Sequence, residues 1–115
     1  MEKIVRQTLL YDFYGELLTS HQQRIYEDAV FHDLSLSEIA EAEGISRQGV
    51  HDLVRRCDRI LEDYEDKLHL LRKFSKTREQ IEQIRDLADS SRTQPMLDER
   101  MKQIEALCAG ILAGL

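Results

Sequence analysis

Few residues in this chain could support a β-strand, a disulfide framework or a metal centre. The 115 residues include one proline, five glycines and two cysteines. No stretch alternates polar and apolar residues as a half-buried strand does. Charged residues make up 33% of the chain, and many stand four residues from an opposite charge, an arrangement that favours helices. We therefore expect an all-α protein.

The cysteines and histidines form no recognisable site in the sequence. Cys57 and Cys108 make no CxxC pair, and no histidine stands at zinc-ligand spacing from either of them. The four histidines have no recurring carboxylate or serine partner at hydrogen-bonding spacing. We expect both cysteines to be small core residues, and we expect neither an enzyme nor a bound cofactor or metal.

Long apolar runs are also missing. No segment approaches the roughly 20 apolar residues that a membrane span needs, and residues 1–6 lack the apolar core of a signal peptide. These absences predict a cytoplasmic protein.

The length suits one core with a helical extension. The net charge of −6 argues against a general polyanion binder, because phosphate neutralisation by Lys and Arg supplies most non-specific affinity for nucleic acid.

Residues 35–56 match the spacing of a helix-turn-helix motif. Ser35 and Glu38 form a capping box at the start of one short helix. Gly44 ends that helix in the left-handed conformation of a tight turn, and Ser46 caps the next helix. The side chains expected to pack between the two helices are Ile39, Ala40, Ile45, Val50 and Leu53.

Two positions depart from the usual motif. Glu43 stands where an apolar residue is more common, and Gly49 lies inside the second helix, where glycine costs up to about 1 kcal/mol relative to alanine. Residues 47–59 hold four arginines against two aspartates, an excess of positive charge in an acidic chain. The second helix is therefore the candidate basic face.

Helical periodicity continues on both sides of the motif. Apolar spacing predicts helices at about 2–19 and 20–31, and a single helix from about 46 to 73 that would be roughly 40 Å long. The apolar stripe of this long helix from Cys57 to Leu71 outruns any core that the first 45 residues can supply. We expect the C-terminal segment, a second copy of the chain, or both to cover it, and so we expect a homodimer.

The remaining residues predict a helical hairpin. Thr77 with Gln80 offers another capping box, so we expect the long helix to be interrupted at 74–77. The hairpin would pack on the long helix or on a dimer partner. Its expected parts are helices at about 77–90 and 95–113 and a polar linker at 89–95. We therefore expect two domains: residues 1–73 would form the helix-turn-helix with its extended helix, and residues 74–115 would form the hairpin.

The stretch from Leu18 to Leu68 resembles region 4 of bacterial sigma factors. The matching residues are Leu-Thr at 18–19, Arg24, Asp-Leu-Ser-Leu-Ser-Glu-Ile-Ala at 33–40 and Gly-Ile-Ser-Arg-Gln-Gly-Val at 44–50. With Tyr-Asp-Phe-Tyr-Gly-Glu-Leu-Leu-Thr at 11–19 and Arg-Cys-Asp-Arg-Ile-Leu-Glu at 56–62, nearly the whole chain resembles the YlxM family of small bacterial helix-turn-helix proteins.

The sigma-like resemblance implies a DNA-reading face on the second helix. Arg47, Gln48 and His51 would meet base edges in the major groove, while Arg55 and Arg56 would lie nearer the DNA backbone. Asp52 and Arg59 complete the candidate nucleic-acid-binding set. No promoter-melting or polymerase-binding region accompanies the motif, so a complete sigma factor is excluded.

The YlxM-like resemblance leaves two functions open. Members of this family are described as DNA-binding or regulatory, and gene neighbourhood links them to the signal recognition particle GTPase. The first function is a homodimeric regulator that binds DNA through the helix from Ser46. The alternative is an accessory protein that binds signal recognition particle RNA or the GTPase without sequence-specific DNA readout.

Overall fold

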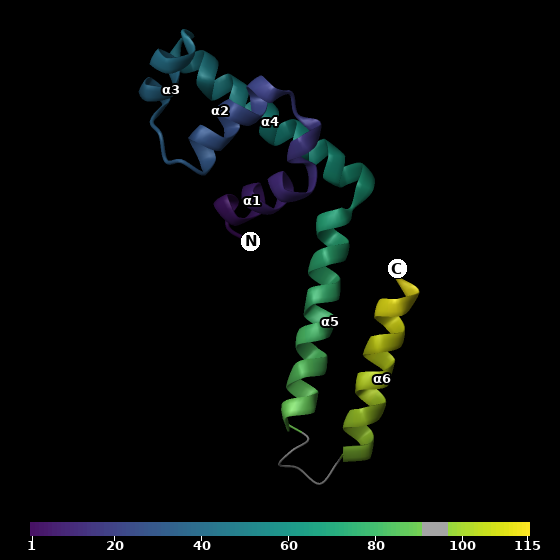
Figure 1. Cartoon of the computed structure of the whole chain (residues 1–115). Helices are drawn as coiled ribbons and strands as arrows, with labels where there is room; N and C mark the ends of the chain where they lie inside the picture. The colour runs from purple at the N-terminus through teal and green to yellow at the C-terminus, as the bar shows by residue number, and fades with distance from the viewer. Residues whose placement is uncertain (91–96) are drawn as a thin grey trace. The chain divides into compact units, whose positions relative to one another are not determined.

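The computed structural model describes residues 1–90 and 97–115, and within these residues it is helical throughout (Figure 1). It contains six α-helices, one short 3-10 helix (η1) and no strand in the described part, as the sequence predicts. The elements are α1 (Lys3–Tyr14), η1 (Gly15–Leu17), α2 (Ser20–Val30), α3 (Leu36–Glu43), α4 (Arg47–Leu68), α5 (Leu70–Ser90) and α6 (Leu97–Ala113). The chain divides into two compact units, Met1–Leu71 and Arg72–Leu115.

Side-chain caps fix where the helices of the first unit begin. The Thr19 hydroxyl accepts from the Gln22 N–H, and the Gln22 side chain accepts from the Thr19 N–H, so a capping box starts α2. Ser35 and Glu38 form the same reciprocal pair at α3, as predicted. The two residues of a capping box are three positions apart, and this is why the box of Ser35 and Glu38 can be recognised from the sequence alone.

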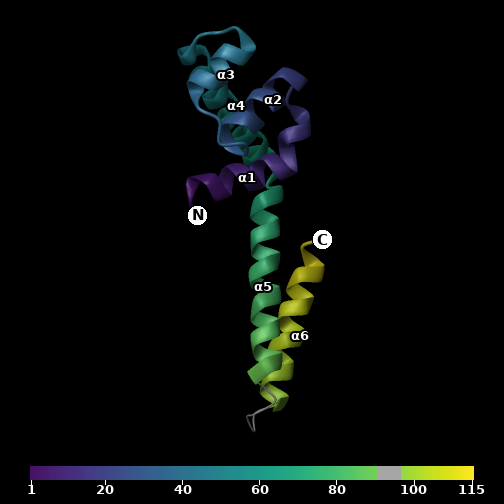
Figure 2. The same cartoon turned by 60° about the vertical axis from the view of Figure 1, so that its left-hand side comes forward.

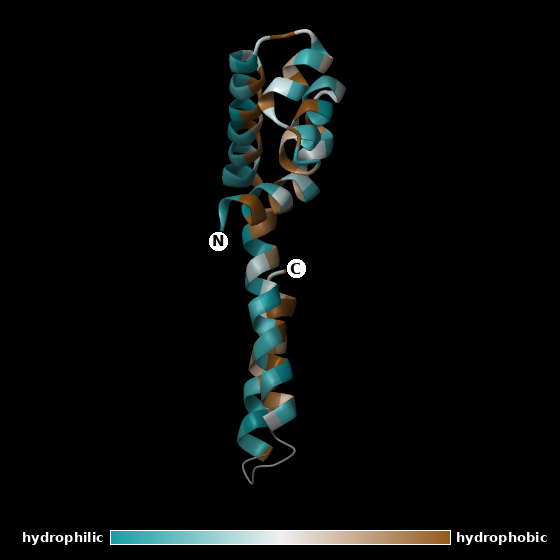
Figure 3. Ribbon diagram, turned by 90° about the vertical axis from the view of Figure 1, so that its left-hand side faces the viewer, coloured by the Kyte–Doolittle hydropathy of each residue, from teal (hydrophilic) through white to brown (hydrophobic). Residues whose placement is uncertain are grey.

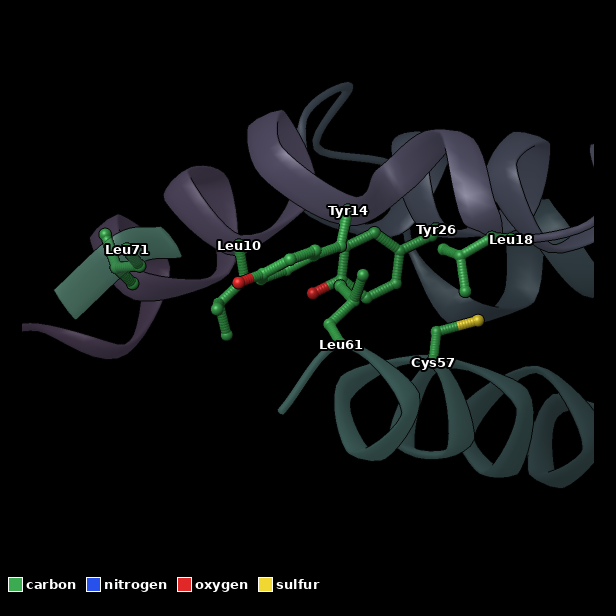
Figure 4. Packing of buried hydrophobic residues seen from close by; sticks show 7 residues of the cluster. All are labelled: Leu10, Tyr14, Leu18, Tyr26, Cys57, Leu61 and Leu71. Atoms are coloured by element: carbon green, nitrogen blue, oxygen red, sulfur yellow. The ribbon is translucent and has the colours of Figure 1, made fainter. Parts of the chain in front are cut away.

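The core of the first unit lies between α1, α2 and α4. Figure 4 shows the cluster, in which side chains of α1 and α2 pack on α4. The expectation that the stripe from Cys57 to Leu71 needs a cover from outside residues 1–45 is wrong for Cys57, Leu61 and Leu71, which pack with α1. Leu68 of the same stripe remains 49% exposed. The buried members of the cluster are Leu10, Tyr14, Leu18, Tyr26, Cys57, Leu61 and Leu71.

The predicted continuous helix over 46–73 is wrong. α4 ends at Leu68, His69 adopts a left-handed conformation with φ of 58°, and α5 begins at Leu70. The predicted interruption at 74–77 is also wrong, because these residues lie inside α5. Apolar residues recur at helical spacing through residues 68–71, so the spacing could not predict that α4 ends at Leu68.

A buried polar network explains why the helix breaks at His69. The Tyr14 hydroxyl donates to Glu65 Oε1 at 2.7 Å, and it accepts from the N–H of Leu70 at 3.0 Å. The N–H of Leu71 donates to the same Glu65 oxygen at 3.0 Å. The first N–H groups of a helix have no partner within the helix, so these two acceptors provide the start that α5 needs. Glu65 is buried, which makes each of these bonds costly to lose.

The second unit is built from α5 and α6, which lie side by side in both Figure 1 and Figure 2. Of the expected linker at 89–95, Asp89 and Ser90 belong to α5, and 91–95 lie outside the described residues. No side chain is buried among residues 72–89 and 97–115. The helix expected from about 95 is described from Leu97 onward.

The two cysteines differ in environment. Cys57 is fully buried, and burial raises the pKa of its thiol to about 11. Cys108 is exposed on α6, so the expectation that it is a core residue is wrong. Over the described ranges, no helix is long and apolar enough to cross a membrane, and no group of three or more His, Cys, Asp or Glu side chains is arranged to hold a metal ion.

Candidate nucleic-acid interface

The turn between α3 and α4 has helix-turn-helix geometry. Gly44 has φ of 70° and ψ of 28°, and its N–H donates to the Ala40 carbonyl at 2.9 Å. The Ser46 hydroxyl then accepts from the Gly49 N–H at 2.9 Å and starts α4. The left-handed residue and the cap lie two residues apart, so the chain reverses from one helix into the other within a single short turn. A small core between α2, α3 and α4 supports the turn, formed by Ile25, Ile39, Ala40 and Val50.

Ile45 takes less part in this core than expected. It is 38% exposed, while Val50 is buried and Leu53 is half-buried. The Ile45 side chain lies against Gly49, where an added Cβ would be 3.9 Å from two Ile45 carbons and 3.1 Å from Ser46 Oγ. Glycine at this position therefore leaves room for the cap of α4, which offsets part of its low helix propensity.

Glu43 holds the turn by an ion pair where an apolar residue is more usual. Arg24 on α2 donates from Nε and Nη2 to the two Glu43 carboxylate oxygens, at 2.7 and 2.8 Å. His21 Nε2 lies 3.6 Å from the same carboxylate. These hydrogen bonds lower the pKa of Glu43. A bidentate pair is directional, so it fixes α3 against α2 in one orientation.

The predicted binding residues gather on the side of α4 that faces away from the core. Residues 47, 51 and 55 are each four apart and so form one row along the helix, and residues 48, 52, 55 and 59 form the adjacent row. The structure places six of them in exposed positions and one, His51, in a half-buried position. The exposed six are Arg47, Gln48, Asp52, Arg55, Arg56 and Arg59.

One of the two acids counted on this helix points away from the exposed side. Asp58 Oδ1 accepts from the Tyr26 hydroxyl at 2.6 Å and from Gln7 Nε2 at 3.0 Å. Burial and this hydrogen bond raise the pKa of Tyr26. Asp58 is thus engaged by α1 and α2, but it keeps its charge and lies beside Arg55 and Arg59, so the exposed side of α4 between Arg47 and Arg59 has the net positive charge that the sequence count gives.

Asp52 is the acid that remains among the arginines. Gln48 Nε2 donates to Asp52 Oδ1 at 2.9 Å, and His51 Nδ1 lies 3.7 Å from the same oxygen. A glutamine amide carries two N–H donors and one carbonyl acceptor. The hydrogen bond to Asp52 uses one donor, orients the amide along the helix surface, and leaves one donor and one acceptor free to face a ligand.

Sequence reasoning missed one cation at this surface. Lys3, from the first turn of α1, lines a surface hollow of about 580 Å³ together with His51, Arg55 and Arg59 of α4. The hollow also includes Asp58 and Glu62. Lys3 and Arg55 are more than fifty residues apart in sequence, so no local pattern could have grouped them. The packing of α1 on α4 brings Lys3 there.

Comparison with known proteins identifies a matching family over most of the chain. A family model described as "Putative helix-turn-helix protein, YlxM / p13 like" matches residues 1–104. The UPF0122 protein YlxM of Bacillus subtilis is 38% identical over 107 residues, covering 93% of this chain and 97% of that protein. A UPF0122 protein of Geobacillus kaustophilus is 46% identical over 86 residues, covering 75% of this chain and 78% of that protein. Another, of Caldanaerobacter subterraneus subsp. tengcongensis, is 49% identical over 79 residues, covering 69% of this chain and 68% of that protein.

Proposed function

Because the chain belongs to the YlxM/p13-like family of helix-turn-helix proteins, we propose that it is a DNA-binding regulatory protein that reads duplex DNA with the first turns of α4. The observation that carries this proposal is the charge on the exposed side of α4. Four arginines lie there with Asp52, while Asp58 is held by Tyr26 and Gln7. Arginine supplies both phosphate neutralisation and guanine contacts, so this is the surface of the first unit best suited to DNA.

The proposed docking follows that of region 4 of sigma factors. The N-terminal half of α4 enters the major groove, and α3 crosses the DNA backbone. Arg47, Gln48 and His51 lie on the first turns of α4 and face base edges. Arg55 and Arg56 lie one to two turns further along and contact phosphates, together with the cations Arg59 and Lys3.

Gln48 is suited to an adenine in this arrangement. Adenine presents an acceptor and a donor in the major groove, and the Gln48 amide has one donor and one acceptor left after its hydrogen bond to Asp52. Asp52 therefore positions Gln48, and it opposes non-specific contact with phosphate by its own negative charge. Both effects favour binding that depends on the DNA sequence over binding by charge alone.

The test is a selection from randomised duplex DNA at about 0.1 M salt, a concentration at which phosphate contacts are partly screened. We expect an enriched sequence motif that is lost with Arg47→Ala. Removing one bidentate contact should cost about 1 to 3 kcal/mol of binding free energy at a single base position. Arg55→Ala and Arg56→Ala should weaken binding to all sequences alike and should each reduce the salt slope by about one. Lys76→Ala on α5 removes one positive charge outside the proposed interface and is the control.

A second candidate is an accessory protein of the signal recognition particle pathway. The net charge of −6 favours a protein partner over nucleic acid, and Glu38 and Glu41 are exposed on α3 beside the proposed interface. The same selection therefore includes signal recognition particle RNA and its GTPase. If no duplex is enriched, and RNA or GTPase binding survives Arg47→Ala and Gln48→Ala, the groove-reading function is contradicted and the accessory function is supported.

A further inference from the structure

The second unit has an apolar surface that its own two helices do not cover. No side chain is buried among residues 72–89 and 97–115. A unit of two helices has too little interior to stabilise itself and usually relies on association. The large apolar side chains left open to solvent in it are Phe74 44%, Ile81 54%, Leu97 50%, Met101 44%, Leu112 68% and Leu115 92% exposed.

The exposed apolar residues of α5 and α6 lie on one side of the pair. Half-buried residues mark where the helices face each other, and a Cβ at Gly110 would lie 3.3 Å from the Gln80 side chain. Ile81, Met101 and Leu112 each follow a half-buried residue by one position. Because the helices are antiparallel, this equal rotation brings both sets to the same side, and in Figure 3 the hydrophobic colour recurs along one side of the pair. Apart from Ser75, the half-buried residues are Thr77, Gln80, Ile84 and Leu87 on α5, and Arg100, Ile104, Leu107 and Ile111 on α6.

The spacing along both helices is that of a helical bundle. Successive steps of four and three residues continue for two heptads on each helix, which is the pattern of helices that pack side by side with knobs in holes. On each helix some of these residues are half-buried and the others remain exposed, so the exposed ones are left to contact a further helix. The residues in these positions are Phe74, Thr77, Ile81, Ile84 and Ala88 on α5, and Leu97, Met101, Ile104, Cys108 and Ile111 on α6.

Charges beside the exposed set show which partner fits. Arg85 follows Ile84 on the outer edge of α5, and Glu105 follows Ile104 on the outer edge of α6. Arg78 is already paired with Glu82 of the same helix at 3.3 Å. Two copies packed face to face, with a two-fold axis parallel to the helices, bring each α5 edge against the partner's α6 edge. Gln80 lies next to Gly110, so these two residues stand at the same height along the helix axes. Residue 85 lies five residues beyond Gln80, and residue 105 lies five residues before Gly110 on the antiparallel helix, so they also share one height. Arg85 therefore stands level with the partner's Glu105.

We propose that α5 and α6 form the homodimerisation surface of this protein, in which two hairpins pack as an antiparallel four-helix bundle with Arg85 of each chain opposite the partner's Glu105. The apolar residues Ile81, Met101 and Leu112 fill the centre of this interface. The Arg85–Glu105 contacts favour this orientation of the two copies, because it places opposite charges at the same level along the helices. This inference goes beyond DNA reading, since it involves no residue of α4.

The first test is the mass of the full-length protein by sedimentation equilibrium, from about 1 to 100 µM. We expect twice the chain mass of 13.5 kDa at the upper end. Met101→Glu should abolish the dimer, because it places a charge in an apolar seam. A wild-type protein that stays monomeric throughout this range overturns the proposal.

The second test uses charge reversal, which leaves the apolar surface intact. Arg85→Glu and Glu105→Arg should each weaken self-association by about tenfold or more, since each introduces two repulsive contacts by symmetry. An equimolar mixture of the two variants should regain a dimer of near wild-type affinity, because both contacts are complementary only between the two different chains. Glu99→Arg, an exposed reversal on the opposite side of α6, should leave the affinity unchanged. If the charge reversals leave the dimer affinity unchanged, or if the mixture does not regain the affinity of the wild type, this arrangement is overturned.

Discussion

At the scale of single residues, carboxylates determine how the helices of the first unit are placed. Five of them accept hydrogen bonds from side chains on other helices, so each fixes a relation that apolar packing alone leaves adjustable. Arg6 pairs with Glu62 at 2.6 Å, for example, and the guanidinium lowers the pKa of that carboxyl. The five acceptors are Glu27, Glu43, Asp58, Glu62 and Glu65.

The Tyr14 hydroxyl is the residue-scale feature most sensitive to change. Tyr14→Phe removes the donor to Glu65 and the acceptor for the Leu70 N–H, which leaves the Glu65 carboxylate in a buried place and the Leu70 N–H in a partly buried one. We expect the free energy of unfolding in urea to fall by about 1 to 3 kcal/mol. Tyr64→Phe is the matched control, since its ring stacks on Tyr14 at 5.9 Å while its hydroxyl lies outside this network. Equal effects of the two substitutions would contradict the role given to the network.

The ion pair between Arg24 and Glu43 predicts a pH dependence of stability. The pKa of Glu43 is lower in the folded protein than its ordinary value of 4.5. Its contribution is therefore present above the unfolded pKa and is lost as the pH falls through the folded pKa. At about pH 6 we expect Glu43→Gln to be less stable than wild type. The difference in thermal unfolding between the two should shrink as the pH is lowered to about 3, because the wild type then loses the contribution of the carboxylate. A stability difference that stays constant over this range would show that the carboxylate charge has no part.

At the scale of elements, three breaks between helices of the first unit contain a left-handed residue, and Asp33, between α2 and α3, is one of them. Gly44 separates α3 from α4, and His69 separates α4 from α5. Glycine adopts this conformation without steric cost, whereas a residue with a Cβ pays about 1 to 2 kcal/mol. His69 bears this cost because the network of Tyr14 and Glu65 holds the start of α5 in place.

Gly44 allows the backbone effect to be measured without a steric clash. An added Cβ would meet no atom within 4 Å, so Gly44→Ala changes only the conformational cost. We expect a loss of about 1 to 2 kcal/mol in the free energy of unfolding, and a smaller loss for Gly44→Asn, because asparagine tolerates the left-handed region. Chemical unfolding followed by circular dichroism measures both. Alanine and asparagine variants of equal stability would refute this account of the turn.

At the scale of the whole molecule, the two units differ in how their apolar residues are covered. The buried side chains of the described part lie between Leu10 and Leu71, and the second unit has none. Local stability follows burial, so the units are expected to open independently. The first unit carries the helix-turn-helix geometry within its own core, while the second unit has no buried side chain among its described residues.

Hydrogen exchange can separate the two units. At low micromolar concentration, the amides of α5 and α6 should exchange faster than those of α4, because few buried contacts oppose their opening. Raising the concentration should increase protection in α5 and α6 but not in α4, since mass action favours the dimer. Mass spectrometry of peptides from each helix measures this. Equal protection of α4 and α6 at every concentration would contradict the difference between the units.

The sequence by itself determined the features whose partners lie close together in the chain. The all-α composition, the caps at Ser35 and Ser46, and the left-handed turn at Gly44 all follow from residues within a few positions of one another. The exposed face of α4 also follows, because helical spacing separates it from the apolar positions that pack inward. The proposed roles of that face in DNA reading remain predictions.

Only the tertiary structure decided the features that join distant residues. The break at His69 requires Tyr14 to meet Glu65 across 51 positions, and the inward turn of Asp58 requires Tyr26 across 32. The same holds for the pairing of Glu43 with Arg24 and for the cover that α1 gives to α4. Apolar periodicity states that a face will be buried but not what buries it, because every apolar partner satisfies it equally well. Directional hydrogen bonds and ion pairs select one partner, and they form only once the chain has folded.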